Sequence, residues 1–126
     1  APKDADVHNN LGFALMAAGR HAEAIDVLRK ALMLDGSQDR TRNNLGFALA
    51  ATGDDKAAWR VLKAGTNAVS AHNNLALAQE VRGDIDAALN TYNTILSIEP
   101  DHTKAHAAIA RLHALQSKPS QTGSSQ

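Results

Sequence analysis

The sequence has no cysteine, and this absence removes several kinds of chemistry at once. It excludes disulfide bonds, thiol nucleophiles and thiolate metal sites, although it leaves the cellular compartment open. An excess of either charge is also missing, because 13 basic residues balance 13 acidic ones. The chain therefore lacks the basic surplus of nucleic-acid binders and basic membrane-surface proteins. No apolar run approaches the roughly 18 residues that a membrane-spanning helix needs.

Aromatic residues are scarce at 3%, and runs of β-branched residues are absent, whereas alanine is very frequent. Alanine has the highest helix propensity, and its small side chain lets helix backbones approach one another. A chain of 126 residues is long enough for one domain with a real core. The composition therefore favours an all-α fold of closely packed helices.

One seven-residue stretch occurs three times along the chain. Asn-Asn-Leu-Gly-Phe-Ala-Leu at 9–15 returns almost unchanged at 43–49, 34 residues later. A looser copy, Asn-Asn-Leu-Ala-Leu-Ala, begins at residue 73, a further 30 residues along. Self-similarity at such a period indicates stacked structural repeats.

Apolar residues recur at helical spacing between these landmarks. In the first helix the stripe contains Val7, Leu11, Ala14, Leu15 and Ala18. Glycines or a proline stop most of the segments, since glycine adopts left-handed backbone and proline cannot continue a helix. The pattern predicts helices over about 5–18, 21–34, 39–51, 54–64, 68–81, 85–98 and 102–116.

Polar residues at the helix starts are predicted to act as caps. Asp4, Asp54, Asn67, Asp84 and Asp101 each stand where a side-chain oxygen can accept the free backbone N–H groups of the following turn. Residues 117–126 contain no apolar side chain. Such a segment cannot offset the entropy of its own ordering, so we expect a flexible tail.

These residues resemble the tetratricopeptide repeat (TPR), whose pattern joins Leu-Gly to later alanines, large apolar residues and a closing proline. The resemblance covers about residues 5–116. It implies a single TPR domain over 1–116, an α-solenoid of three helix-turn-helix repeats at about 5–38, 39–68 and 69–102 with a capping helix at about 102–116. The matching positions are Leu11, Gly12, Leu15, Ala24, Leu28 and Ala31, then Leu45, Gly46, Leu49, Ala58 and Leu62, then Leu75, Ala76, Ala88, Tyr92, Ile95 and Pro100.

The sequence departs from the TPR pattern in three respects. The aromatic residue that usually precedes Leu-Gly is missing from every repeat. Polar Gln79 stands at a normally apolar position, and Gly65 replaces a later alanine where the fourth helix is about one turn short. We expect the packing of the family to survive with modest stability. The residues at the aromatic positions are His8, Arg42, His72 and His106.

A further resemblance is to the TPR proteins of bacterial Flp-type (tight-adherence) pilus assembly. Their repeats often read Asn-Asn-Leu-Gly or Asn-Asn-Leu-Ala with a Gly-Asp turn, as at Gly53-Asp54 and Gly83-Asp84. This resemblance implies a location on the periplasmic side or at the outer membrane. A cytoplasmic location is expected without it.

Residues offset from the Leu-Gly side of each first helix should face the concave groove of a solenoid. They follow the spacing i, i+4, i+7 and i+11. In chain order the lines are Asp6, Asn10, Phe13 and Ala17, then Arg40, Asn44, Phe47 and Ala51, then Ser70, Asn74, Leu77 and Val81, and finally Lys104, Ala108, Arg111 and Leu115.

This alignment predicts three kinds of binding contact. A ladder of carboxamides could bind a peptide backbone, because an amide both donates and accepts hydrogen bonds. Apolar side chains supply anchor sites, and basic ones could hold an acidic group or a C-terminal carboxylate. The predicted binding residues are Asn10, Phe13, Arg40, Asn44, Phe47, Asn74, Leu77, Lys104 and Arg111.

The sequence leaves the role of the asparagine pairs open and argues against one known kind of TPR binding site. The asparagine pairs could instead cap turns or bond neighbouring helices, which would equally explain their recurrence. The family's best-known carboxylate clamp needs several Lys and Arg in the early repeats, and Asp6 occupies one of those places. A clamp for chaperone tails is therefore not expected.

No motif for catalysis stands out. His102 and His106 have the i, i+4 spacing of a zinc pair, but no Glu or Cys completes a site, and packing or exposed histidines are the simpler interpretation. Trp59 and Tyr92 are predicted to be core residues. The acidic pairs at helix starts complement the helix dipole. No metal site or cofactor is predicted.

The sequence therefore predicts a noncatalytic interaction scaffold that binds a partner peptide or protein segment in the TPR groove. The alternative is a structural component of a bacterial pilus or secretion complex, acting through its end helices or convex face. In that case changes at Ile109 or Leu112 should abolish assembly. Neither hypothesis involves nucleic acid or direct membrane insertion, and both allow membership of a multiprotein assembly.

Overall fold

A computed structural model describes residues 2–117 of the chain as an all-helical protein. Its helices are α1 (Pro2–Ala17), α2 (His21–Leu34), α3 (Asp39–Ala51), α4 (Asp55–Gly65), α5 (Ala68–Arg82), α6 (Ile85–Ile98) and α7 (Thr103–Ser117). The all-α prediction is confirmed. α2, α3 and α6 have the predicted bounds, and the other helices differ from the predicted bounds by one to three residues at one or both ends. None of these helices is both long and apolar enough to span a membrane. Apart from Ser117, the predicted tail at 117–126 lies outside the described residues.

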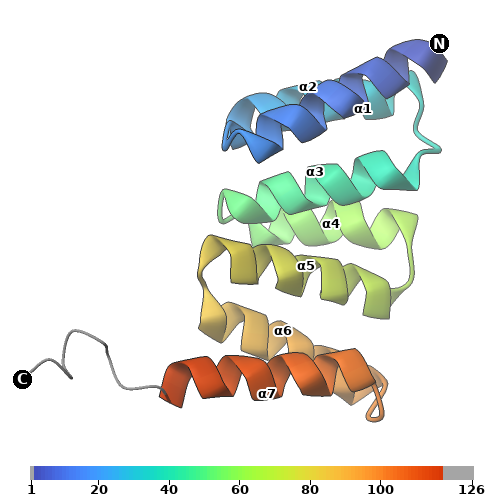
Figure 1. Cartoon of the computed structure of the whole chain (residues 1–126). Helices are drawn as coiled ribbons and strands as arrows, with labels where there is room; N and C mark the ends of the chain where they lie inside the picture. Colours follow the sequence, from blue (N-terminus) through green and yellow to red (C-terminus); the bar gives the residue numbers. More distant parts are fainter. Residues whose placement is uncertain (1, 118–126) are drawn as a thin grey trace, which may run out of the picture.

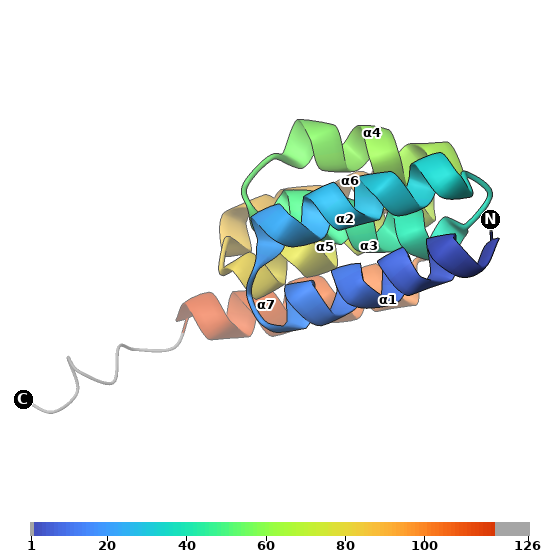
Figure 2. The ribbon, with the colours of Figure 1, turned by 90° about the horizontal axis from the view of Figure 1, so that it is seen from above.

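The helices stack as successive hairpins in two layers (Figure 1). α1, α3, α5 and α7 follow one another down one layer, and α2, α4 and α6 form the other. Viewed down the stack in Figure 2, α2 and α4 lie on the side away from α1 and α7. α3 packs on its partner helix α4, on both helices of the hairpin before it, α1 and α2, and on α5.

The turns follow the chemistry that the sequence indicated. Gly19, Gly53 and Gly83 have φ values of 78°, 93° and 89°, a left-handed conformation that favours glycine. Asp54 accepts a hydrogen bond from the Ala57 N–H at 3.1 Å, and Asn67 and Asp84 cap their helices in the same way. These three predicted caps are confirmed.

The cap predictions for Asp4 and Asp101 are wrong. Asp4 lies inside the first turn of α1, which begins at Pro2. The Nδ1 atom of His102 accepts the hydrogen bond from the Ala105 N–H at 3.1 Å, so the cap lies one residue later and α7 begins at Thr103. A histidine ring nitrogen can accept a hydrogen bond as well as a carboxylate can. Either residue suits a cap chemically, and the loop geometry after Pro100 decides between them.

The core is built where large side chains of one layer enter gaps in the other. Leu28 and Leu62 are buried against Gly12 and Gly46, and a β-carbon at Gly12 would lie only 2.5 Å from the Leu28 side chain. In the third repeat Tyr92 takes the place of these leucines and is likewise buried, which confirms it as a core residue. Trp59 is half-buried and packs against the same core.

The residues that replace the usual aromatic before Leu-Gly pack in different ways. The His72 ring stacks on Trp59 with centroids 4.1 Å apart, so α4 and α5 meet through a histidine and a tryptophan. Burial lowers the pKa of His72, which favours the neutral ring in this stack. Arg42 instead lies over Gly65, where a β-carbon would approach its Cδ atom to 2.8 Å. Glycine at 65 thus leaves room for the arginine stem.

Gln79 is buried and hydrogen-bonded on both sides, which explains a polar residue at an apolar position. Its Oε1 atom accepts a hydrogen bond from the Thr91 hydroxyl at 2.6 Å. Its Nε2 atom donates to Asp55 at 3.0 Å, and Asp55 also accepts from Arg82 at 2.8 Å. Buried polar groups are tolerated when they are hydrogen-bonded. A satisfied polar network therefore joins α4, α5 and α6.

The stripe of the first helix does not enter the core as its spacing suggests. Leu11 is 49% exposed, whereas its copies Leu45 and Leu75 are 2% and 7% exposed. Val7 is exposed as well. The difference arises because α2 covers α3 and α4 covers α5, while no helix among the described residues precedes α1. The leucine recurs in all three repeats, but among the described residues a preceding helix covers it only in α3 and α5.

Candidate functional site

Five hollows run across α1, α3, α5 and α7, and neighbouring hollows share residues that line them. Phe13 lines three of them, and Leu77 joins the central hollow to the one beside α7. We call this continuous depression the groove. All nine predicted binding residues line it, namely Asn10, Phe13, Arg40, Asn44, Phe47, Asn74, Leu77, Lys104 and Arg111.

Large apolar side chains lie in the groove without being needed by the core. Phe13 is 59% exposed and Val81 is 72% exposed, and Leu77 is exposed too. Together with Met16 and half-buried Phe47 they line the two hollows nearest the C-terminal ends of these helices. Side chains of this kind, grouped on one surface, are typical of sites that bind a protein segment.

The asparagine pairs have a structural role that the sequence left open. Asn44 donates a hydrogen bond from Nδ2 to Asn9 Oδ1 at 3.0 Å, and Asn74 donates to Asn43 Oδ1 at 3.3 Å. The second asparagine of one repeat is therefore bonded to the first asparagine of the repeat before it. This agrees with the alternative in which the pairs bond neighbouring helices, and it accounts for their recurrence.

The two ends of this amide row differ from its middle. Asn10 and Asn73 have no side-chain hydrogen bond among residues 2–117, because α7 carries alanines at the corresponding places and nothing described precedes α1. Asn10 lines the hollow beside Phe13, and Asn73 lines the two hollows beside Lys104. Their amides face the groove with their full hydrogen-bonding capacity.

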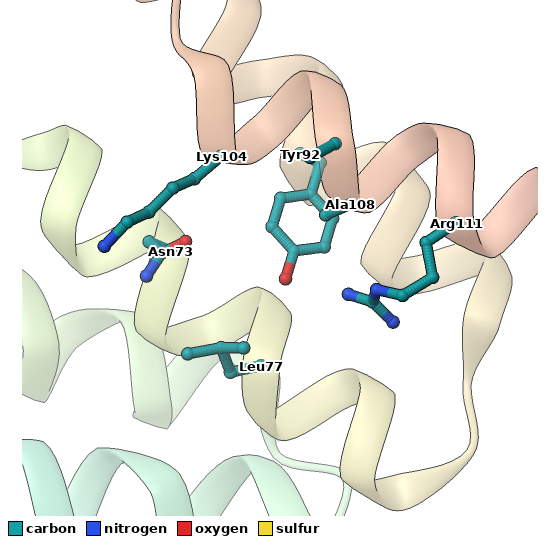
Figure 3. A pocket seen from close by; sticks show the side chains of 7 residues that line it. Asn73, Leu77, Tyr92, Lys104, Ala108 and Arg111 are labelled. Atoms are coloured by element: carbon teal, nitrogen blue, oxygen red, sulfur yellow. The ribbon is translucent and has the colours of Figure 1, made fainter.

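The three predicted cations are not equivalent. Arg111 is paired with Glu80 within the protein, at an Nη1–Oε1 distance of 2.7 Å. Arg40 forms an exposed ion pair with Asp6, with an Nη2–Oδ1 distance of 3.8 Å. Lys104 makes no ion pair within the described residues, and Figure 3 shows it reaching from α7 toward Asn73. An acidic ligand group would find its least occupied cation there.

Glu80 connects this end of the groove to the core. The Arg111 hydrogen bonds lower the pKa of Glu80, although burial opposes them, and Tyr92 donates to the same carboxylate at 2.5 Å. Burial and the Glu80 hydrogen bond raise the pKa of Tyr92, so its hydroxyl stays protonated. Arg111 is thus a positioning residue for Glu80 and Tyr92 rather than a free anion receptor.

Comparison with known proteins agrees with this architecture. Two TPR family models match the chain, one over residues 5–37 and one over residues 69–92. The first TPR of Spaghetti (RPAP3), solved with the HSP90 peptide SRMEEVD, superposes with a TM-score of 0.59 at 17% identity, covering 94% of this chain and 97% of that one. The chain folds as a TPR α-solenoid, and its residues 5–37 and 69–92 match tetratricopeptide repeat models.

Two further solved structures show the same fold. The second TPR domain of human RPAP3, in complex with the HSP70 peptide SGPTIEEVD, has a TM-score of 0.59 at 18% identity and covers 90% of this chain and 98% of that one. YrrB, described as a TPR protein with an unusual peptide-binding site, has a TM-score of 0.58 at 21% identity. That match covers 83% of this chain and 56% of YrrB. No curated protein matches the sequence.

The predicted lines contain most groove residues, and further groove residues lie between these lines. Met16, Asn43 and Asn73 also line hollows. Asn43 and Asn73 belong to the recurring pairs, so the repeat itself was the signal. Met16 had no comparable signal, because no other repeat carries methionine there. The resemblance to pilus-assembly TPR proteins gains no support from these comparisons.

The histidines of the last TPR helix are engaged in local structure. His102 caps α7, and His106 donates from Nε2 to the Pro100 carbonyl oxygen at 2.7 Å. Within residues 2–117 no three His, Asp or Glu side chains converge in a way that could hold a metal ion. What the site presents is an open surface of amides, exposed apolar side chains and three cations, of which Lys104 has no ion pair among the described residues.

Proposed function

We propose that this TPR solenoid is a noncatalytic scaffold that binds a segment of a partner protein in its groove. The observation that supports this most directly is the joining of five hollows along four helices, lined in part by the exposed apolar side chains of Phe13, Leu77 and Val81. The RPAP3 structures of the same fold hold chaperone peptides, and YrrB is described by its peptide-binding site. These relatives support the class of function rather than the partner.

Replacing Phe13 and Leu77 together by serine tests the groove. Both side chains are exposed, so we expect the helical fold to be retained while partner affinity falls about 30-fold, the equivalent of losing two kcal/mol of anchor contacts. Crosslinking mass spectrometry from native cells identifies the partner and the contacted face, and titration calorimetry then measures affinity for the identified segment.

Met33→Ser is the matched control for this experiment. Met33 is the most exposed large apolar residue of the described chain, and it lines none of the five hollows. Its replacement removes a similar exposed side chain without touching the groove. Equal affinity of the Phe13→Ser/Leu77→Ser variant and the control would refute groove binding.

The outer face of α1 favours assembly as a second candidate function. Val7 and Leu11 are exposed there, although the residues in the position of Leu11 are buried beneath a preceding helix in both later repeats. Asn10 lacks the amide partner that Asn44 and Asn74 have. Both features fit a helix placed over α1 as α2 is placed over α3. The end helix α7 is less suitable, because Leu112 is only 1% exposed and its replacement would disturb the core.

The assembly role is tested with Val7→Lys and Leu11→Lys in one variant. Since both residues are exposed, we expect unchanged helicity of the isolated chain, but loss of the native complex in size-exclusion chromatography of cell extracts. The Phe13→Ser/Leu77→Ser variant should leave the complex at its original size. The assembly role is refuted if the lysine variant elutes with the complex as the parent does.

A further inference from the structure

The groove differs in character from one long edge to the other. The N-terminal parts of its helices carry Asp6, Arg40, Ser70 and Lys104, and their middles carry the amide row. Beyond the amides come Phe13, Phe47 and Leu77, and then Val81. One edge is therefore charged and polar, and the other, which we call the apolar edge, is lined by large hydrophobic side chains.

From these two edges we propose that the ligand segment is an amphipathic α-helix lying along the stack. Its apolar face would contact Phe13, Phe47, Leu77 and Val81, and an acidic residue would lie near Lys104. The inference rests on the proposed groove function and adds the conformation and pattern of the segment bound. Width, spacing and charge each support it.

The width of the groove suits a helix. The width of the groove can be counted along each helix that lines it. On α1, for instance, Asp6 of the charged row and Phe13 of the apolar row are seven residues apart. At 1.5 Å per residue this is about 10 Å, close to the diameter of about 10–12 Å of a helix with its side chains. An extended strand is about 5 Å wide in the plane of its backbone and would reach only one edge.

The spacing along the apolar edge also suits a helix. Packed helices lie about 8–10 Å apart, so successive anchors such as Phe47 and Leu77 recur at about that interval. Residues i and i+7 of a ligand helix lie on the same face about 10.5 Å apart. In an extended strand, side chains of one face recur at about 7 Å and 13 Å, and those about 10 Å apart point to opposite faces.

The amide row no longer argues for an extended peptide. Asn44 and Asn74 are each bonded to an asparagine of the preceding repeat, so their recurrence reflects contacts between helices. An extended ligand needs partners for its backbone groups, whereas a helix satisfies its own. The side chains of a helical ligand can then make most of the contacts, as in other helix-in-groove complexes.

The charge pattern orients the ligand. Arg40 already faces Asp6, and Arg111 already binds Glu80. Lys104 alone of the three predicted cations has no ion pair among the described residues. A carboxylate on the polar side of the ligand helix is therefore best placed at the α7 end of the groove, where Asn73 and Asn74 line the same hollow.

Selection from a random library tests the inference without knowledge of the natural partner. Twenty-residue peptides displayed on phage are selected on the chain and counter-selected on a Phe13→Ser/Leu77→Ser/Val81→Ser variant, whose helicity is checked by circular dichroism. We expect enriched peptides with apolar residues at i, i+3 or i+4, and i+7, and with Asp or Glu on the other face. An enriched peptide should gain helicity on binding, and Lys104→Glu should weaken it about tenfold while Lys56→Glu leaves it unchanged.

Each outcome of the selection decides something. Enriched peptides with a two-residue alternation, or with no gain of helicity on binding, would overturn the helical ligand while leaving groove binding intact. Equal binding to the Lys104→Glu variant would overturn the acidic contact. If no peptide discriminates the chain from the counter-selection variant, peptide binding in the groove falls together with the inference.

Discussion

Gly46→Ala is expected to destabilise the solenoid by about 2 kcal/mol and to lower Tm by about 8 °C. A β-carbon at Gly46 would lie far inside van der Waals contact with two carbons of Leu62, which is buried. Overpacking of this kind costs about 3 kcal/mol, and the better helix propensity of alanine returns only about 1 kcal/mol. The steric cost exceeds the gain in helix propensity, so the substitution is expected to lower the free energy of unfolding. Thermal and urea denaturation followed by circular dichroism measures it.

The control for this prediction relieves the clash from the other side. Leu62→Ala alone should cost about 2–5 kcal/mol through the cavity that it leaves. In the double variant the new methyl group at 46 occupies part of that cavity, so the combined cost should be smaller than the sum by 1 kcal/mol or more. Simple additivity, or a Gly46→Ala protein as stable as the parent, would contradict the contact.

In the third repeat a different pair of residues makes the contact between the small residue of the first helix and the large residue of the second. Ala76 stands in place of Gly12 and Gly46, and Tyr92 stands in place of Leu28 and Leu62. All of the larger partners are buried. Ala76 and Tyr92 are both buried in one cluster, so the third repeat accommodates an alanine together with a tyrosine. The small residue and its large partner have thus changed together between repeats of one chain.

Local pattern was sufficient to predict the helices and the groove, because both depend on short-range features. Apolar spacing and the glycine turns place the helices, and the repeat then places Asn10, Phe13 and their copies on one side. The prediction that these residues share a surface needed only the assumption that the repeats stack. Whether they bind a partner stays a prediction.

Most of the wrong or incomplete predictions involve a neighbour that the local sequence does not show. Leu11 has the same flanking sequence as Leu45, yet its exposure depends on a covering helix. Arg111 looked available for a ligand, but Glu80 lies 31 residues away in the sequence and 2.7 Å away in space. The amides of Asn44 and Asn74 are likewise turned toward the preceding repeat. Such contacts follow from the packing of repeats and not from their spacing.

Arg82→Ala is expected to cost about 2 kcal/mol, measured as the change in the free energy of unfolding by urea. The guanidinium donates to the Ala50 carbonyl oxygen at 2.6 Å and to Asp55 at 2.8 Å, so one side chain joins α5 to the α3–α4 turn. Its removal leaves Asp55 with Gln79 alone as a side-chain partner. The pair is partly exposed, and solvent screening keeps the cost below that of a fully buried ion pair.

Arg60→Ala is the matched control, since Arg60 is exposed and makes no ion pair among the described residues. It should change stability by less than about 0.5 kcal/mol. A cycle that adds Asp55→Ala should give a coupling of about 1 kcal/mol between Arg82 and Asp55. Equal effects of the two arginine variants would show that the network contributes no more than a surface charge does.

The acid dependence of stability gives a second measure of the same network. Burial alone would raise the pKa of Asp55, but hydrogen bonds from Arg82 and Gln79 outweigh it and lower that pKa. Because the folded state holds the proton less tightly, the contribution of Asp55 is present above its unfolded pKa near 4 and disappears as pH falls through the lower folded value. Arg82→Ala should therefore flatten the loss of stability below about pH 4. Glu80, whose pKa Arg111 lowers, should leave a residual slope in the variant. A slope identical to that of the parent would mean that Arg82 does not interact with the ionised Asp55.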